Sequence, residues 1–272
     1  MVSCPHMQIS RIHWIGALIT LAAVLVAAGI WYAAIRPHVP AEALAPAVAT
    51  STVPVSPPAA SSTPAAVANV GPFPMNAADT NVSWTFKGAY AGNDALTAQA
   101  NADITKLKGL LGKGQYDDYD LYDGIANDYA SLGDGKLAYQ YYNSAIHLFP
   151  NQGLAYANLG NSLSQMGAYY TAADAYAKAV AVNPAMLEYH LERLTFLTQK
   201  LPTDTARITA ALADASKQFG DTAPILTIEA QWLTAEGRYA DAIKAWQTAK
   251  TLSPGKDTSA IDAEIARLQA KL

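Results

Sequence analysis

The first long apolar run of the chain extends from Trp14 to Ile35, 22 residues that include no charged side chain. A helix rises about 1.5 Å per residue, so this run can cross a hydrocarbon core of about 30 Å. The pattern predicts a single transmembrane helix within residues 13–36, preceded by a short tail of residues 1–12. A cleaved signal peptide is the competing interpretation, but the apolar region of a signal peptide is shorter, about 7 to 15 residues.

Residues 37–80 lack both helical and alternating periodicity and are rich in proline and alanine. Nine of the 15 prolines lie between Arg36 and Asn76, and Glu42 is the only charged residue there. Such a composition cannot bury a core, so we expect a disordered, extended linker. Arg11 and Arg36 flank the apolar run, so the positive charges on its two sides are nearly balanced. The positive charge of the amino terminus favours the orientation with the N-terminus inside. This predicts a single-pass inner (cytoplasmic) membrane protein with an extracytoplasmic domain.

Residues 81–118 are expected to lead into the folded domain, with ordered structure beginning near Trp84. Val82, Trp84 and Phe86 alternate with polar residues, which is typical of a short extended segment. The apolar spacing over residues 95–111 then predicts one helix.

From Tyr119 onward, small, aromatic and proline residues recur with a period of 34. With Tyr119 as position 1, the first unit has Tyr122 at position 4, Ala126 at 8, Ala138 at 20, Tyr142 at 24, Ala145 at 27 and Pro150 at 32. The second unit has Tyr156, Gly160, Ala172, Tyr176, Ala179 and Pro184 at the same positions. A further unit has Ala242, Trp246 and Ala249 at positions 20, 24 and 27, and it ends at Pro254. Self-similarity at such a period predicts a solenoid of stacked helical hairpins.

These residues resemble the signature of the tetratricopeptide repeat (TPR), which has a large residue at position 4, a small one at 8, and alanine, aromatic, alanine and proline at 20, 24, 27 and 32. The resemblance implies an all-α fold, a right-handed α-solenoid of about four helical hairpins with a C-terminal capping helix. The expected units are residues 119–152, 153–186, 187–222 and 223–254, followed by the capping helix within 255–272.

The third of these units is degenerate. It begins with a convincing helical pattern over 187–200, but Leu201-Pro202-Thr203-Asp204 interrupts it before a second helix. We expect a TPR hairpin with a lengthened turn. The last segment should cover the apolar face that the final repeat would otherwise leave in water.

Composition argues against several classes of function. The chain has 18 Lys and Arg residues, spread thinly, so there is no basic stripe for phosphates and no nucleic-acid partner is expected. Cys4 is the single cysteine, and no two histidines of the repeat region have metal-ligand spacing, so no metal site is expected. Nucleophile motifs and glycine-rich dinucleotide loops are missing from the sequence. We therefore expect no enzyme, no catalytic residues and no cofactor.

The densest charge cluster lies at the start of the first unit and comprises Asp117, Asp118, Asp120 and Asp123. It is not a calcium loop, because the acid expected at position 12 would be Tyr129. Carboxylates at a helix start are stabilised by the amide dipoles there, which is one interpretation. The alternative is a functional acidic patch at the mouth of a binding groove.

In the TPR family the first helix of each hairpin lines a concave groove through positions 2, 5, 6, 9, 12 and 13. The corresponding candidate peptide-binding residues here are Asp120, Asp123, Asn127, Asn158, Asn161, Gln165, Glu188, Glu192 and Gln231. A clamp for a C-terminal carboxylate needs cations where this chain has acids. We instead expect an asparagine-lined groove that grips an extended backbone and favours a neutral to basic segment. Ordinary solvated helix positions are the alternative.

Together these features predict a non-catalytic, membrane-anchored TPR scaffold that binds another protein or an extended peptide through its concave groove, in a bacterial envelope. A second hypothesis makes it an accessory subunit that positions an envelope enzyme or assembly machine, in cytochrome maturation, pilus biogenesis or cell-wall biogenesis. A third places a hidden hydrolase or transferase site in the degenerate third unit.

Overall fold

The computed structural model describes residues 73–272. The predicted transmembrane helix and residues 37–72 of the predicted linker lie outside the described residues. Between residues 73 and 272, no helix is long and apolar enough to cross a membrane.

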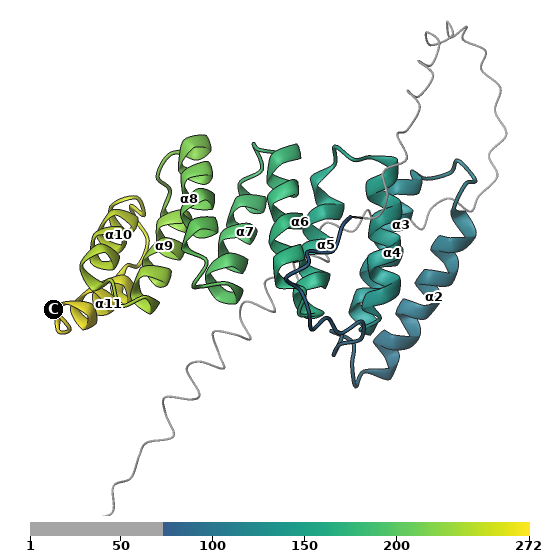
Figure 1. Cartoon of the computed structure of the whole chain (residues 1–272), viewed down its shortest axis with the longest axis horizontal. Coiled ribbons are helices and arrows are strands. Elements are labelled where there is room, and N and C mark those ends of the chain that lie inside the picture. The colour runs from purple at the N-terminus through teal and green to yellow at the C-terminus, as the bar shows by residue number, and fades with distance from the viewer. Residues whose placement is uncertain (1–72) are drawn as a thin grey trace, which may run out of the picture. The chain divides into compact units, whose positions relative to one another are not determined.

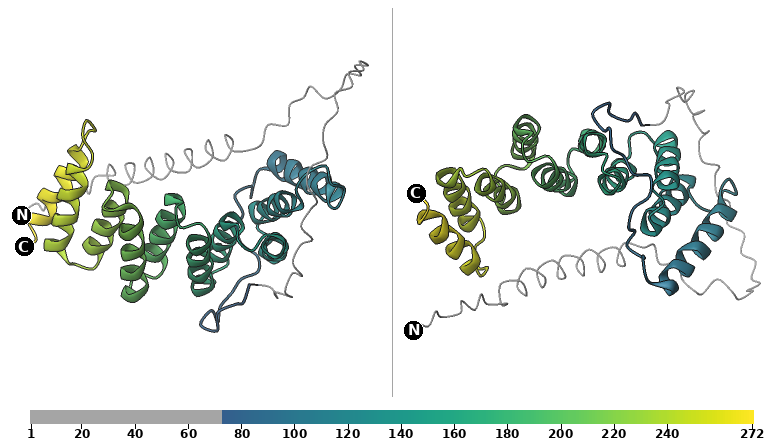
Figure 2. Two further views of the ribbon diagram at one scale, coloured as in Figure 1. Left: turned by 90° about the horizontal axis from the view of Figure 1, so that it is seen from above. Right: turned by 60° about the horizontal axis from the view of Figure 1, so that its bottom comes forward.

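Ten helices follow one another in the described part of the chain, and each packs beside the next (Figures 1 and 2). They are α2 (Asp94–Leu110), α3 (Asp118–Leu132), α4 (Gly135–Leu148), α5 (Gly153–Gln165), α6 (Tyr169–Val182), α7 (Leu187–Lys200), α8 (Thr205–Phe219), α9 (Ala223–Ala235), α10 (Tyr239–Thr251) and α11 (Ser259–Gln269). The all-α prediction is confirmed for this part. Four consecutive hairpins, α3–α4 to α9–α10, follow α2 and precede α11.

Small residues let the two helices of a hairpin approach closely. In the first hairpin, Ala126, Ala138 and Ala145 are fully buried. In the second, a Cβ atom on Gly160 would lie 3.0 Å from the ring of Tyr176, so this ring packs directly on the glycine backbone. The residues that carry the 34-residue signature are therefore packing residues in these hairpins.

The degenerate third unit is a helical hairpin like its neighbours. Asp204 caps α8 by accepting a hydrogen bond from the Arg207 backbone N–H at 3.1 Å. The lengthened turn contacts the fourth hairpin, because Trp232 Nε1 donates to the Pro202 carbonyl at 3.1 Å. The helical hairpin removes the reason for placing a hidden active site in this unit.

Helix α11 covers the apolar end of the fourth hairpin. Leu268 is fully buried, and Ile261 and Ile265 pack against the core. Asp257 holds the start of this helix, since its carboxylate accepts from the Ser259 backbone N–H at 2.9 Å. The predicted capping helix is confirmed.

An extended segment, residues 73–92, precedes α2 and is called the arm below; it is the dark-blue segment beside α5 in Figure 1. Helix α6 begins after Ala168, which offers no capping side chain. Asp79 of the arm replaces it, accepting from the backbone N–H groups of Tyr170 at 3.0 Å and Thr171 at 2.7 Å. These are the donors that a local N-cap residue would satisfy, so α6 is capped from 91 residues away.

Residues 73–80 correct the linker prediction, which extended to residue 80. The Asn76 backbone N–H donates to Thr171 Oγ1 at 2.8 Å, and the Asn76 side chain donates to Asp174 at 2.9 Å. Phe73 packs edge-on against the Tyr156 ring, with 5.9 Å between centroids. The composition of residues 73–80 could not predict this docking, because the residues that they contact lie far along the chain. The sequence pattern of those helices predicts only their packing within the repeats.

The arm then crosses the turns within the first two hairpins. The backbone N–H of Ser83 donates to the Met166 carbonyl at 2.8 Å, and that of Phe86 donates to the Gly133 carbonyl at 3.0 Å. An isolated antiparallel bridge joins Thr85 to Asp134. The extended conformation predicted from the alternation around Trp84 is confirmed, and it ends beside α3.

The contact between the arm and the first hairpin predicts unequal effects of two matched substitutions. Gly133 and Gly237 occupy the same repeat position with φ of 86° and 74°, but a Cβ on Gly133 would lie 2.1 Å from the Phe86 carbonyl oxygen, whereas one on Gly237 meets nothing within 4 Å. Gly237→Ala should cost only the left-handed backbone strain, about 1–2 kcal/mol. Gly133→Ala should lower the free energy of unfolding by a further ~1–3 kcal/mol through overpacking. Urea unfolding followed by circular dichroism measures both, and equal losses would contradict a tightly docked arm.

Candidate functional site: a polar groove on α3, α5 and α7

Asp123, in the middle of α3, is a buried carboxylate that ties the first hairpin to the second. Asn127 Nδ2 donates to Asp123 Oδ2 at 2.9 Å from one turn further along α3. Asn158 Nδ2 on α5 donates to both carboxylate oxygens, at 3.1 and 3.0 Å. Among residues 73–272, only neutral amides therefore compensate the burial of this negative charge.

The environment of Asp123 changes its acidity. Burial raises the pKa of the Asp123 carboxyl to about 6, the hydrogen bonds from Asn158 and Asn127 oppose the rise, and the charge of Asp120 adds to it. Burial dominates because removing a carboxylate from water penalises the charged form more than two neutral donors stabilise it.

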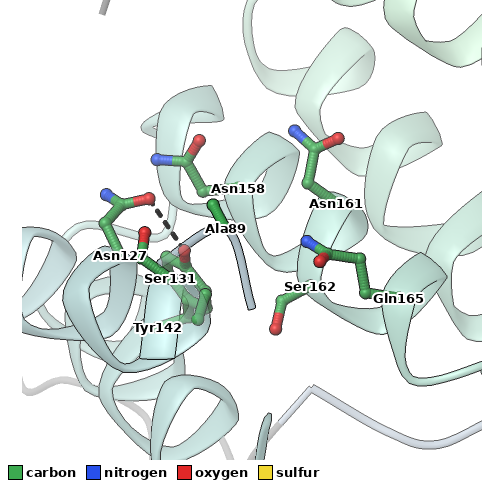
Figure 3. Close-up of a pocket in the computed structure, with 9 residues that line it drawn as sticks. Ala89, Asn127, Ser131, Tyr142, Asn158, Asn161, Ser162 and Gln165 are labelled. Atoms are coloured by element: carbon green, nitrogen blue, oxygen red, sulfur yellow. Dashed lines mark hydrogen bonds between the residues drawn. The ribbon is translucent and has the colours of Figure 1, made fainter. Parts of the chain in front are cut away.

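Two tyrosine hydroxyls fix the direction of two asparagine amides. Tyr142 donates to Asn127 Oδ1 at 2.9 Å, the contact drawn in Figure 3, and Tyr176 donates to Asn161 Oδ1 at 2.7 Å. Each pair joins the first and second helix of one hairpin with the same separation of 15 residues. With its oxygen held by Tyr176, Asn161 presents its amide nitrogen, which has no hydrogen-bond partner among residues 73–272.

A polar cavity of about 150 Å³ lies between α3 and α5 (Figure 3). Its lining consists of Ala89, Asn127, Ala130, Ser131, Tyr142, Asn158, Asn161, Ser162 and Gln165. Ser162 is 1% exposed, and its buried hydroxyl oxygen has no hydrogen-bond partner among the described residues. Ala89 belongs to the arm, so the arm forms part of the wall.

A second cavity, of about 320 Å³, lies between α5 and α7. It is lined by Asn161, Ser164, Tyr176, Leu191, Glu192, Thr195, Phe196, Gln199 and Lys200. Burial raises the pKa of the Glu192 carboxyl, and the charge of Glu188 adds to the rise. Because Asn161 lines both cavities, the two form neighbouring parts of one surface, which is called the groove below.

The remaining predicted site residues are less central. Asp120 and Glu188 are exposed on α3 and α7 and act on the groove through their charge. Gln231 is exposed on α9 and lines neither cavity. The groove residues that the structure brings together thus come from the first three hairpins.

The residues of the acidic cluster at the start of α3 have different roles. Some stabilise local structure, and one faces the second hairpin. Asp117 is the N-cap and accepts from the Tyr119 backbone N–H at 2.9 Å, and Asp118 accepts from that of Gly112 at 2.9 Å. Asp117 stabilises the helix start, and Asp118 joins it to the turn that follows α2. Asp123 faces α5 instead and holds two residues that line the groove, Asn127 and Asn158.

In the predicted asparagine-lined groove, Asn127 and Asn158 are already engaged with Asp123. A buried carboxylate requires donors, and the nearest are these two amides. Sequence reasoning also missed Tyr142 and Tyr176, because position 24 was treated as packing, and it missed Ser162, which lies between the expected groove positions. The recurrence of asparagine at position 9 with tyrosine at 24 in both units was the available signal.

The described part of the chain contains no set of metal ligands. Residues 73–272 contain no group of three or more His, Cys, Asp or Glu side chains placed to hold a metal ion.

No protein-family model and no curated protein sequence matches the chain. Among solved structures, the TPR protein TTC0263 of Thermus thermophilus is 19% identical, with 65% of this chain and 96% of that chain covered and a TM-score of 0.43. MamA is 14% identical, with 66% and 95% covered and a TM-score of 0.47. PilF of Pseudomonas aeruginosa is 18% identical, with 68% and 83% covered and a TM-score of 0.41. Likeness at this level concerns the fold and assigns no ligand to the groove.

The raised pKa of Asp123 predicts a pH-dependent stability. The unfolded carboxyl has an ordinary pKa of 3.8, so the folded state binds its proton more tightly. The resulting stabilisation is complete below pH 3.8 and is lost as the pH rises through about 6. The difference of about two pKa units corresponds to about 3 kcal/mol.

Asp123→Asn should therefore flatten the fall in the free energy of unfolding between pH 4 and 7, measured by urea titration at each pH. Asp120→Asn, an exposed carboxyl on the same helix, is the control and should change the slope much less. Parallel curves for wild type and Asp123→Asn would contradict the buried-carboxylate assignment.

Proposed function

We propose that this protein is a non-catalytic, membrane-anchored scaffold that binds an extended segment of another protein in the groove on α3, α5 and α7. The observation that carries the proposal is the pair of adjoining cavities that share Asn161. A row of cavities along successive first helices suits an extended chain better than a compact small molecule.

The groove contains side chains that can form hydrogen bonds with the main chain of a bound peptide. Asn161 presents an amide nitrogen, and the exposed Gln165 carries a second amide without an internal hydrogen bond among the described residues. The buried Ser162 hydroxyl adds a group that can donate or accept. Peptide backbones alternate donors and acceptors, so these groups can bind a segment with little regard to its side chains.

The size of the groove sets the length of the segment. Packed helices lie roughly 10 Å apart, so α3 and α7 are separated by roughly 20 Å. An extended peptide advances about 3.3 Å per residue and would need about six residues to cover that distance. The carboxylates of Asp123, Glu188 and Glu192 favour a neutral to basic segment.

The membrane anchor completes the proposal. The uncharged run from Trp14 to Ile35 supports a transmembrane helix, and the proline-rich tract after it supports a spacer. The arm continues directly from this tract, so the spacer would join the helical domain through the arm. We propose a bacterial inner membrane, with the N-terminus inside and the helical domain outside the cytoplasm.

Groove binding can be tested with peptides that the full chain selects from a display library of random sequences of about twelve residues, about twice the length of the groove. Asn161→Ala combined with Gln165→Ala should weaken binding of a selected peptide by about tenfold or more, because two hydrogen bonds are worth about 1 kcal/mol each. Fluorescence anisotropy gives the affinities. Asn127 and Asn158 are unsuitable for this test, since removing either leaves Asp123 under-satisfied.

Two control variants show whether a loss of peptide affinity arises in the groove. Gln231→Ala, on α9, should leave the affinity unchanged. Gln165→Ala alone removes no internal hydrogen bond and should still weaken binding, which separates a binding effect from a folding effect. Selection of no peptide at all, or equal affinities for every variant, would refute the groove as a peptide site.

Topology is tested with a cysteine in the spacer. In a Cys4→Ser background, Ser61→Cys should react with a membrane-impermeant maleimide added to intact cells, because the spacer is proposed to lie outside the cytoplasm. A tag fused before Met1 should stay on the membrane-bound protein, since the anchor is not cleaved. Labelling only after lysis would reverse the orientation, and loss of the tag would favour the signal-peptide interpretation.

A further inference from the structure

Glu192, on α7, indicates which type of side chain the bound segment places in the groove. Its Oε2 atom is buried and has no hydrogen-bond partner among residues 73–272, although the residue lines the cavity between α5 and α7. A carboxylate without a donor is costly to bury, and a ligand in the cavity that brings a donor to this carboxylate reduces that cost.

The negative charge around Glu192 is not neutralised internally. The pKa of the Tyr189 hydroxyl is raised by burial and then by the charges of Glu192, Asp123 and Glu188, so all three carboxylates act on this part of α7. In the described part of the chain, none of these three carboxylates forms an ion pair.

The nearby basic residues are turned to other partners. Arg193 pairs with Asp214 at 2.9 Å. Lys200 lines the cavity, but its Nζ lies 5.9 Å from the centroid of the Tyr169 ring. Neither supplies the cation that Glu192 lacks.

The walls of the cavity suit an aliphatic stem that ends in a cation. Leu191 and the rings of Tyr176 and Phe196 form its apolar side, with the two ring centroids 5.0 Å apart. Lysine and arginine pack their methylene groups on apolar surface while the charged end finds polar partners. An aromatic wall also attracts a cation through its ring face.

We propose that the cavity between α5 and α7 receives a lysine or arginine side chain of the bound segment and that Glu192 pairs with its cationic group. This inference rests on the proposed peptide-binding function and adds a position-specific preference to it. A carboxylate or phosphate ligand is disfavoured by the same unneutralised charge, and an apolar side chain would leave Glu192 Oε2 unsatisfied.

The test uses the full chain and the random-peptide display library. Peptides selected by the wild type should carry Lys or Arg at one fixed position. Replacing that residue with glutamine in one selected peptide should weaken binding by about tenfold or more, the effect of losing a charge-assisted hydrogen bond. Glu192→Gln, which preserves size, should weaken the basic peptide similarly and leave the glutamine peptide unchanged, so that the two losses are not additive.

Controls and opposite outcomes separate this inference from the function it rests on. Glu236→Gln, an exposed carboxyl at the end of α9, should keep the preference for the basic residue. N-acetyl-lysine methylamide tests a free cation and should compete only at far higher concentration than the peptide. If peptides are selected without a fixed basic position, or Glu192→Gln keeps the preference, the inference fails while groove binding stands. If the free lysine derivative competes as strongly as the peptide, the ligand of the cavity is a small cation and not a peptide segment. If no peptide is selected at all, both the inference about Glu192 and the proposed peptide-binding function fail.

Discussion

The buried carboxylate of Asp123 is the constraint on which the groove depends. A charge in the interface between two hairpins must be given donors, and here both donors are side-chain amides, one from α3 and one from α5. Their geometry fixes how α3 and α5 lie against each other at this point. Because neutral amides only partly offset the burial, the carboxyl remains a weak acid with a pKa of about 6.

This requirement divides the polar residues of the groove into two groups. Asn127 and Asn158 face inward and hold Asp123, so they are structural. The amide nitrogen of Asn161 and the amide group of Gln165 have no hydrogen-bond partner among the described residues, so they are available to a ligand. A tyrosine hydroxyl at position 24 fixes the asparagine at position 9 in both hairpins, so a residue of the packing signature also orients the binding surface.

The arm joins the part of the chain with linker composition to the groove. It begins with Phe73 against α4 and α5, caps α6 through Asp79, crosses the hairpin turns, and reaches the wall of the first cavity at Ala89. A chain that enters a repeat domain in this way is fixed by many contacts over two hairpins instead of at one point. The arm therefore links the first two hairpins to the wall of the groove.

The helices and their order follow from sequence patterns alone. The 34-residue period, the alanines at positions 8, 20 and 27, and local caps such as Asp204 act between neighbours in the chain, where pattern and propensity are visible. The groove positions follow from the resemblance of these units to the TPR signature. Which of those residues are free to bind is a property of the tertiary structure. The burial of Asp123, the capping of α6 by Asp79, and the unpartnered oxygen of Glu192 depend on helices and segments that meet across long sequence separations, and desolvation arises from that packing and not from any local pattern.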